Sequence, residues 1–242
     1  MLVQIGHLEA IFRYPVKSMA GERLEIANLG WHGLDGDRRL AFRRTQDRSG
    51  FPWLTAGKFP GMLLFSPQRG EDGSPGNLPT HVRTPDGQRM PMFGEDLAAD
   101  VGRRYGAPVE MMQLKNGIFD DASISVIASD TVREICRLAG RNPDVRRFRP
   151  NIVLRLLEPA PFQENGWLGR VVIFGDADDA PAITVTMPDV RCSMVNLDPD
   201  SATPAPEVLK AIVHENQNHA GIYAAVTRAG RLAVGQTVFL QG

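Results

Sequence analysis

Cys192 has the clearest capacity for chemistry of any residue in the sequence. It is one of two cysteines among 242 residues, and it directly follows Arg191. A neighbouring cation favours the thiolate, the form of cysteine that attacks electrophiles or binds a soft metal. An isolated cysteine is also often a small buried hydrophobic residue. The local sequence therefore leaves two interpretations of Cys192, a reactive or metal-binding thiolate and a core side chain.

A basic segment, Arg-Arg-Phe-Arg-Pro-Asn at residues 146–151, is the second candidate. If this segment is extended, Arg147, Arg149 and Asn151 share one face, because side chains two residues apart point the same way in a strand. Guanidinium groups bind phosphate oxygens with a rigid fork of donors, and an amide adds directional hydrogen bonds. Charged side chains usually lie on surfaces, so a solvated basic edge strand is the alternative to a site for a phosphorylated ligand.

Two further segments place charged and hydroxyl side chains at the ends of expected strands. Lys17 and Ser18 follow one strand, and Asp37 and Arg38 begin another. Corners between loops and strands often present functional groups. Pairs of this kind also occur on almost any protein surface, so their meaning depends on what the fold places beside them.

Short apolar segments bounded by Gly, Pro, Asp and Ser predict a mixed α+β protein that is predominantly β, with few short helices. Asp86-Gly87 predicts a tight hairpin at residues 81–90, and the polar, Gly-rich and Pro-rich residues 68–80 predict an exposed loop. The predicted strands are residues 8–14, 23–27, 38–44, 63–66, 109–114, 152–157, 171–174, 182–187, 223–228 and 236–240.

Helical periodicity predicts three helices, at residues 95–105, 129–140 and 207–215. In the second of these, Ser129 or Asp130 can cap the beginning and Gly140 can end the helix. Cys136 lies on the apolar face of this helix, so we expect it in the core.

Composition restricts the class of protein. Hydrophobic residues make up 43% of the chain, charged residues 23%, and the formal net charge is −1, which is typical of a globular protein with a substantial core. Dispersed basic residues predict no binding of nucleic acid or of an anionic membrane surface. The absence of a long apolar run and of a signal peptide favours the cytoplasm.

Several cofactor classes are disfavoured by the same sequence. Two cysteines and five histidines without His-Glu-x-x-His spacing cannot form a four-cysteine zinc or iron–sulfur site or a zinc-protease site. Glycine-rich phosphate loops of the Walker and dinucleotide types are absent, which disfavours ATP and nicotinamide chemistry.

Taken in order, the motifs resemble the MOSC family, proteins related to the C-terminal domain of molybdenum cofactor sulfurase. The resemblance covers nearly the whole chain, and the motifs are Tyr14-Pro15-Val16-Lys17-Ser18, Gly36-Asp37-Arg38, Thr55-Ala56, Arg147-Phe148-Arg149-Pro150-Asn151, Arg191-Cys192, Asp198-Pro199-Asp200, Gly221-Ile222-Tyr223 and Val234-Gly235-Gln236-Thr237-Val238.

The resemblance implies a fold and a set of site residues. It implies a β-barrel-like MOSC domain at residues 116–242, packed on an N-terminal β-rich domain at residues 1–115. It implies that Cys192 coordinates the molybdenum of a pterin cofactor. The residues that match positions around the pterin and its phosphate are Lys17, Ser18, Arg38, Ser123, Arg149, Asn151, Arg191 and Tyr223.

The same resemblance implies a function. The chain is similar to the amidoxime-reducing branch of the family, which implies an oxidoreductase with the molybdenum cofactor. Such an enzyme reduces small N-hydroxylated compounds or N-oxides with electrons from a separate donor protein. Two alternatives remain open: a sulfur carrier or sulfurtransferase with a persulfide on Cys192, and a non-catalytic carrier of the cofactor.

The chain departs from the family pattern at two positions. After Thr55-Ala56 the family usually has arginine, whereas this chain has Gly57 followed by Lys58. After Lys17-Ser18 the frequent cysteine is Met19. The first departure concerns a contact on the substrate or anion side, because a lysine point charge cannot reproduce the fork of a guanidinium.

Overall fold

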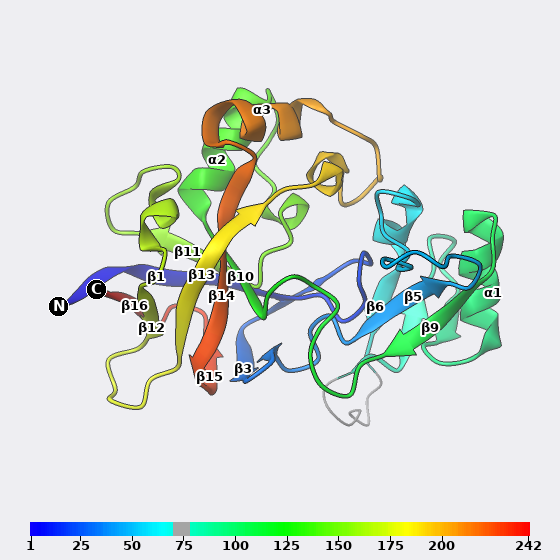
Figure 1. Ribbon diagram of the computed structural model, residues 1–242, viewed down its shortest axis with the longest axis horizontal. Helices are drawn as coiled ribbons and strands as arrows, with labels where there is room; N and C mark the ends of the chain where they lie inside the picture. The colour runs from blue at the N-terminus through cyan, green and yellow to red at the C-terminus, as the bar shows by residue number, and fades with distance from the viewer. Residues whose placement is uncertain (70–77) are drawn as a thin grey trace.

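Seven strands form a closed β-barrel, which is the larger lobe of the molecule (Figure 1). The computed structural model describes residues 1–69 and 78–242. Around the barrel the strand order is β11-β10-β14-β13-β12-β16-β1, and β1 pairs with β11 to close it. A further short strand, β2 (Glu22–Leu24), pairs with the C-terminal end of β1. The barrel strands are β1 (Leu2–Arg13), β10 (Ile124–Ala128), β11 (Ile152–Leu156), β12 (Val171–Phe174), β13 (Ala182–Val190), β14 (His219–Arg228) and β16 (Thr237–Gln241).

Apolar residues on the inner face of these strands fill the barrel. Leu8, Ile11, Val126, Ile152 and Ile222 are buried in one cluster there. Successive side chains of a strand point to opposite faces, so apolar residues at a spacing of two can line the interior of a small barrel. The pairings are antiparallel apart from β10 with β11, which is parallel.

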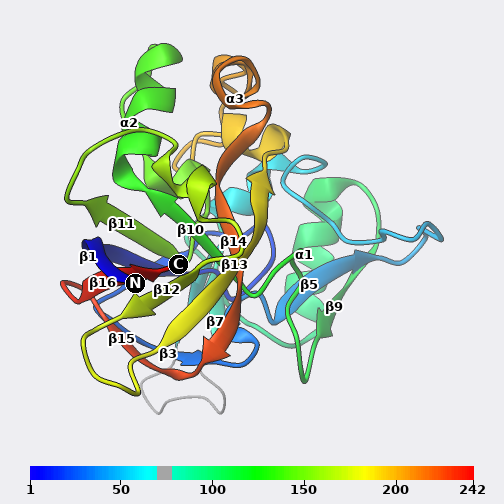
Figure 2. The ribbon, with the colours of Figure 1, turned by 60° about the vertical axis from the view of Figure 1, so that its left-hand side comes forward.

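Two helices, α2 (Ser129–Leu138) and α3 (Glu207–Asn216), cover the outside of the barrel at one end (Figure 2). Val132, Ile135 and Ile212 pack there in a second cluster. Cys136 is 0% exposed in the same cluster, which confirms the prediction that it is a core residue. The predicted N-terminal cap is wrong: Ala128 occupies the cap position, and Ser129 is already the first helical residue, without a side-chain capping bond. The predicted end is confirmed, because the helix stops at Leu138 and Gly140 follows with a left-handed backbone at φ 64°.

The smaller lobe is built from the first half of the chain. Its core cluster includes Val16, Phe42, Phe65 and Leu97. Helix α1 matches the predicted range, and the predicted hairpin is present, with Gly87 at φ 83° in its turn. The elements of this lobe are β5 (Leu40–Arg44), η1 (Pro60–Leu64), β6 (Ser66–Gln68), β7 (His81–Arg83), β8 (Arg89–Pro91), α1 (Glu95–Tyr105) and β9 (Val109–Gln113).

The segment from residue 60 to residue 80 differs in part from the prediction. The strand expected at residues 63–66 is wrong over most of its length, because Pro60–Leu64 form a 3-10 helix and the strand begins only at Ser66. Proline and glycine at the start of this helix favour a turn over an extended chain. The loop predicted at residues 68–80 includes residues 70–77, which lie outside the described residues.

A small separate sheet, with strand order β15-β3-β4, lies at one end of the barrel. It consists of β3 (Ile26–Gly30), β4 (Gly33–Leu34) and β15 (Gly230–Ala233). Strands β1 and β3 thus pair with strands from the second half of the chain. The division of the chain at residue 115 stays a prediction, but the pairing shows that β1 and β3, both within the first 30 residues, are part of the barrel and its small sheet.

The fold class agrees with the expectation from the sequence, a mixed α+β protein dominated by β structure. Among residues 1–69 and 78–242, no helix has both the length and the apolar character needed to span a bilayer.

Candidate functional site

A pocket of about 380 Å³ lies where the two lobes meet, and Cys192 is on its wall. This volume is in the range of small-molecule and cofactor sites. The pocket brings together seven of the nine predicted site residues, from segments far apart in the sequence: Lys17, Ser18, Arg38, Arg149, Arg191, Cys192 and Tyr223.

The remaining two predicted residues, Ser123 and Asn151, do not line the pocket. Asn151 is fully buried behind it, where its Oδ1 accepts hydrogen bonds from Arg38 Nη1 and from the Ser125 backbone N–H, both at 3.1 Å. Its role in the structure is to hold these two neighbours in place. Ser123 precedes strand β10, whereas Ser125, within that strand, faces the pocket.

The convergence of Arg147 and Arg149 has a different cause from the one predicted. The sequence interpretation was conditional on an extended segment with alternating side chains, but Val145–Arg147 form a 3-10 helix, and Arg149 has a left-handed backbone at φ 51°. Both arginines do line the pocket. Arg147 is held by Asn196 and by an ion pair with Asp198 at 2.8 Å, which leaves Arg149 as the arginine of this segment with fewer protein partners.

Cys192 is a free, exposed thiol at the end of strand β13. It is the residue before a short 3-10 helix, Ser193–Asn196, and its backbone is still extended. Cys136 is also free but buried, so the two cysteines have opposite environments. The interpretation of Cys192 as a core residue is therefore wrong, and its thiol is accessible.

Three residues of the pocket have backbones in the left-handed region: Ser18 at φ 68°, Arg38 at φ 45° and Arg149 at φ 51°. This region is disfavoured for residues with a side chain, and it persists where surrounding structure imposes it, often at functional sites. Here the Arg38 N–H donates to the Tyr14 carbonyl at 2.8 Å, and the Lys17 N–H donates to the Leu40 carbonyl at 2.8 Å. These bonds tie the two corner segments to each other.

Arg38 is buried in a network that uses most of its donors. Its guanidinium contacts Asp37 at 2.6 Å, Asp120 at 2.6 Å and the Arg149 carbonyl at 2.8 Å. Burial alone lowers the pKa of a guanidinium, but Asp37 and Asp120 outweigh it and raise the pKa of Arg38 above its ordinary value. Arg38 therefore stays charged, and its contacts hold Asp37, Asp120 and the Arg149 carbonyl in place around the pocket.

Arg191 is likewise held by the protein. Its Nε and Nη1 donate to the carbonyls of Ala220 and Phe148, both at 2.7 Å, and its Nη2 forms an ion pair with Asp189 at 2.7 Å. Gly221 leaves room for this packing, since a Cβ there would lie 3.3 Å from Arg191 Nη2 and 2.5 Å from the Val126 carbonyl. Arg191 therefore joins the end of β13 to neighbouring segments, and it lines the same pocket as Cys192.

Lys17 and Arg149 keep the most donors for a ligand. Lys17 Nζ donates to the Phe119 carbonyl at 2.7 Å, and Arg149 Nη1 donates to the Met19 carbonyl at 2.7 Å. Burial lowers the pKa of both, that of Arg149 to about 10, and Arg38 adds to each decrease. With a pKa of about 10, Arg149 remains cationic at neutral pH. Both side chains have further N–H groups that donate to none of the described residues.

Met19, the departure from the frequent cysteine, does not line the pocket. It is fully buried in the core of the smaller lobe. The side chain at this position therefore contributes packing, and the substitution leaves the pocket wall unchanged.

Sequence reasoning missed the acidic side of the pocket, Asp120, Asp121 and Asp189. Asp189 is 1% exposed, and its Oδ2 accepts from Ser125 Oγ at 2.7 Å and from Arg191. Its Oδ1 is buried without a hydrogen-bond partner among the described residues. Burial outweighs Arg191 and Ser125, raising the pKa of Asp189 to about 6. A charged residue within an otherwise uncharged strand, three positions before Cys192, was the signal available in the sequence.

Asp120 and Tyr223 face each other across the pocket. Tyr223 Oη donates to Asp120 Oδ1 at 3.5 Å. Burial raises the pKa of the Asp120 carboxyl, but Arg38 and Lys17 outweigh this and lower it below its ordinary value. Burial, with Asp189 and Asp120 nearby, raises the pKa of the Tyr223 hydroxyl above its ordinary value. At neutral pH this side of the pocket therefore presents a carboxylate and a protonated phenol.

Within the described part of the chain, no group of three or more His, Cys, Asp or Glu side chains could by itself hold a metal ion. A metal bound at Cys192 would therefore need further ligands from a cofactor. The donor set fits such a group: one exposed thiol for a soft metal, and cationic and hydroxyl donors at Lys17, Arg149 and Ser18 for a phosphate. The unpartnered Asp189 Oδ1 adds an acceptor suited to an N–H donor.

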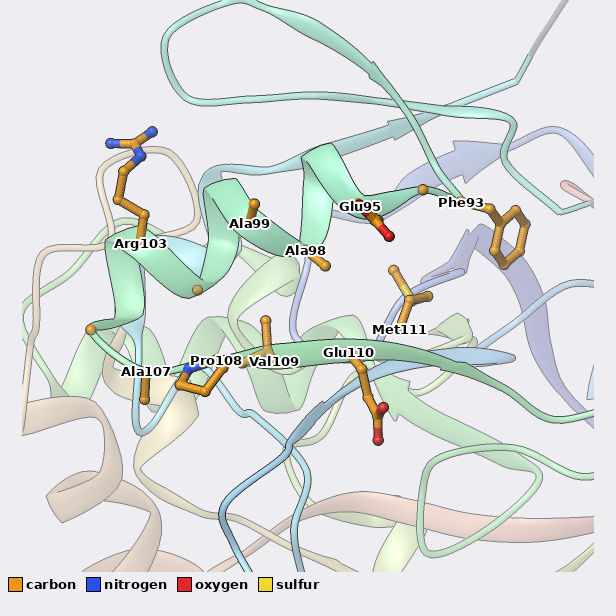
Figure 3. A pocket seen from close by; sticks show the side chains of 13 residues that line it. Phe93, Glu95, Ala98, Ala99, Arg103, Ala107, Pro108, Val109, Glu110 and Met111 are labelled. Atoms are coloured by element: carbon orange, nitrogen blue, oxygen red, sulfur yellow. The ribbon is translucent and has the colours of Figure 1, made fainter.

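A second hollow, of about 790 Å³, lies between helix α1 and strand β9, and we call it the α1–β9 groove (Figure 3). Small and apolar residues, including Ala98, Ala99 and Pro108, form much of its wall. Figure 3 shows Glu110 pointing away from the helix, and Arg103 lies at the far end of α1. None of the predicted site residues lines this groove.

The sequence model of the MOSC domain matches residues 104–239. Among solved structures, the YUAD protein from Bacillus subtilis is similar, with 14% sequence identity, coverage of 99% of this chain and 96% of that one, and a TM-score of 0.52. YiiM from Geobacillus stearothermophilus is 20% identical over 50% of this chain and 55% of its own, with a TM-score of 0.39. No curated protein matches the chain.

Proposed function

The chain belongs to the MOSC domain family, which is associated with binding of the molybdenum cofactor, and from this premise we propose that the pocket at Cys192 binds that cofactor. We further propose that the protein is an oxidoreductase that reduces N-hydroxylated compounds or N-oxides. The observation that carries this proposal is the exposed Cys192 thiol, placed in one pocket with cations from distant segments.

In this proposal each side of the pocket has its own task. Cys192 supplies one soft ligand to molybdenum. Lys17, Ser18 and Arg149 bind the terminal phosphate, because their donors are the least engaged with protein acceptors. Arg38 and Arg191 fix the geometry of the pocket through their bonds to the protein.

When bound, the cofactor supplies the two-electron chemistry of oxygen transfer. The chain contributes orientation, exclusion of water and groups that hold protons. Reduction of an N-hydroxyl group consumes two protons, and Asp189 is a buried carboxyl of the pocket whose pKa, raised to about 6, suits it to take up a proton and pass it to the substrate. The electrons come from a separate donor protein.

The sulfur-carrier alternative uses the same exposed cysteine. A thiol at a pocket mouth could hold a persulfide and pass its sulfur to an acceptor, and a cofactor carrier could use the same pocket without turnover. The structure of the pocket does not distinguish these functions, because each of them requires Cys192 and no second cysteine.

The test is elemental analysis of protein from a molybdenum-competent host, with Cys192→Ser beside Cys136→Ala. We expect stoichiometric molybdenum in the wild type, its loss in Cys192→Ser and its retention in Cys136→Ala, because Cys136 is buried outside the pocket. A sulfane-sulfur adduct on Cys192 without metal would contradict cofactor binding.

Loaded protein separates an enzyme from a carrier. With an artificial electron donor, we expect it to reduce an amidoxime to the amidine. Inactivity of fully loaded protein toward amidoximes and N-oxides would leave cofactor binding in place and overturn the proposed reaction.

A further inference from the structure

The approach to Cys192 has an apolar rim. Phe51, from the smaller lobe, is 51% exposed, and Val190, at the end of β13, is 60% exposed. Both line the pocket, together with the half-buried Met194. The floor is charged, so the pocket combines an apolar mouth with polar groups inside, as small-molecule sites commonly do.

Gly57 leaves an opening in the same wall. It lines the pocket and its φ is outside the left-handed region, so the backbone does not require glycine there. A Cβ on Gly57 would lie 3.5 Å from Ser193 Oγ and 3.7 Å from Thr55 Oγ1, both ordinary contacts with residues of the pocket wall. A side chain at position 57 would fit locally, and it would occupy space next to the residue that follows Cys192.

Two other glycines, unlike Gly57, are required by their backbone conformation and by close packing. A Cβ at Gly33 or Gly221 would meet a backbone oxygen at 2.3 Å or 2.5 Å, and both residues have positive φ angles. Packing and conformation therefore explain those two glycines but do not explain Gly57. The absence of a side chain at position 57 leaves space in the pocket wall beside Ser193, the residue that follows Cys192.

We propose that Gly57 sets the upper size of molecules that reach Cys192, and that Phe51 and Val190 bind the apolar body of the substrate. The substrate class is then an aryl or bulky alkyl compound that carries a reducible N–O group. The N–O part of this inference rests on the proposed function, whereas the size limit at Gly57 does not.

The size limit can be tested on the full chain without metal, through alkylation of the Cys192 thiol. Two maleimides of the same reactivity class and different width, N-methylmaleimide and N-(1-naphthyl)maleimide, are compared in wild type and Gly57→Leu. We expect Gly57→Leu to slow the naphthyl reagent at least about tenfold and the methyl reagent less than about threefold, since a few methylenes discriminate by such factors in a tight site.

Three controls make the result specific. Cys192→Ser should not be labelled, because Cys136 is 0% exposed, and labelling of Cys136 in any variant reports unfolding. Gly166→Leu is the matched control, since Gly166 has open space around its Cβ position, lacks a positive φ and lies outside the pocket. If Gly57→Leu unfolds, Gly57→Ala is used, with the same order of effects but smaller.

Equal slowing of both reagents, or slowing of neither, would overturn the role of Gly57.

The rim is tested on loaded protein with Phe51→Ser combined with Val190→Ser. We expect KM for an aryl amidoxime to rise at least about fivefold and KM for acetamidoxime to stay within about twofold, because the lost contact is apolar. An equal change for both substrates would overturn the role of the rim. Absence of molybdenum in wild type would contradict the proposed function, and the maleimide result would still stand.

Discussion

The α1–β9 groove and the pocket at Cys192 differ in how they are built. The α1–β9 groove is made by one helix and one strand that are close in sequence, and its wall consists mainly of small residues. The pocket at Cys192 has about half that volume, but residues from positions 17 to 223 line it. Its charged groups are tied to backbone carbonyls and to each other. Volume alone therefore does not identify the functional site, whereas the concentration of buried polar groups does.

The largest expected effect on the free energy of unfolding comes from the tighter packing around the pocket at Cys192. Gly221, beside Arg191, has φ 83° and would bring a Cβ to 2.5 Å from a backbone oxygen, whereas Gly106, in the α1–β9 groove, has φ 88° and open space. We expect Gly221→Ala to lower the free energy of unfolding by about 4 kcal/mol, from backbone strain plus overpacking. Gly106→Ala should cost only about 1 kcal/mol, from strain alone. Urea unfolding measures both, and equal losses would contradict the contrast.

Asp189 gives the second effect, a dependence of stability on pH. Its pKa is raised from 3.8 to about 6 in the folded protein, so the folded state holds the proton more tightly than the unfolded state does. The stabilisation from this proton is complete below about pH 4 and is lost as the pH rises through about 6, amounting to about 3 kcal/mol.

Asp189→Asn should remove this component, because an amide does not titrate. The measurement is the free energy of unfolding of both proteins between pH 4 and pH 8. Asp100→Asn serves as the control, because Asp100 is a buried aspartate in α1 that lines neither the pocket at Cys192 nor the α1–β9 groove. A wild-type minus Asp189→Asn difference that stays constant over this range would show that Asp189 titrates as an ordinary carboxyl.

Arg149 gives a third, intermediate effect. It stacks on Tyr14 at 4.1 Å and donates one bond to Met19, which leaves further N–H groups for an anion. We expect Arg149→Ala to weaken retention of a pterin phosphate about 30-fold, equivalent to about 2 kcal/mol for a charged hydrogen bond. Pterin fluorescence after oxidative release measures the bound fraction, and urea unfolding of the same samples separates loss of binding from loss of stability. Full retention of pterin would remove Arg149 from the phosphate site.

The smallest effect is expected in the α1–β9 groove. Arg103 is mostly exposed there and pairs with Asp100 on the preceding turn of the helix. Ion pairs of this kind contribute little, so Arg103→Ala should change the free energy of unfolding by less than about 0.5 kcal/mol. Its molybdenum content should equal that of the wild type. A loss of metal in this variant would mean that the two hollows are coupled.

The local sequence was sufficient for the elements whose signals are local. Helix α1 and the hairpin of β7 and β8 were predictable because periodicity and turn chemistry act over a few residues. The assignment of Cys136 to the core followed from helical spacing in the same way. The ordered motifs also indicated the family, although spacing alone did not show how those motifs meet.

Only the tertiary structure decided which side chains share the pocket. Asn151 lies behind the wall, Ser125 takes the position expected for Ser123, and Asp189 adds a buried carboxylate beside Arg191. These outcomes depend on barrel closure between β1 and β11 and on left-handed turns at Ser18, Arg38 and Arg149, which hydrogen bonds to distant segments maintain. Short-range propensity contains no information about such long-range contacts, because a residue's neighbours in space come from other parts of the chain.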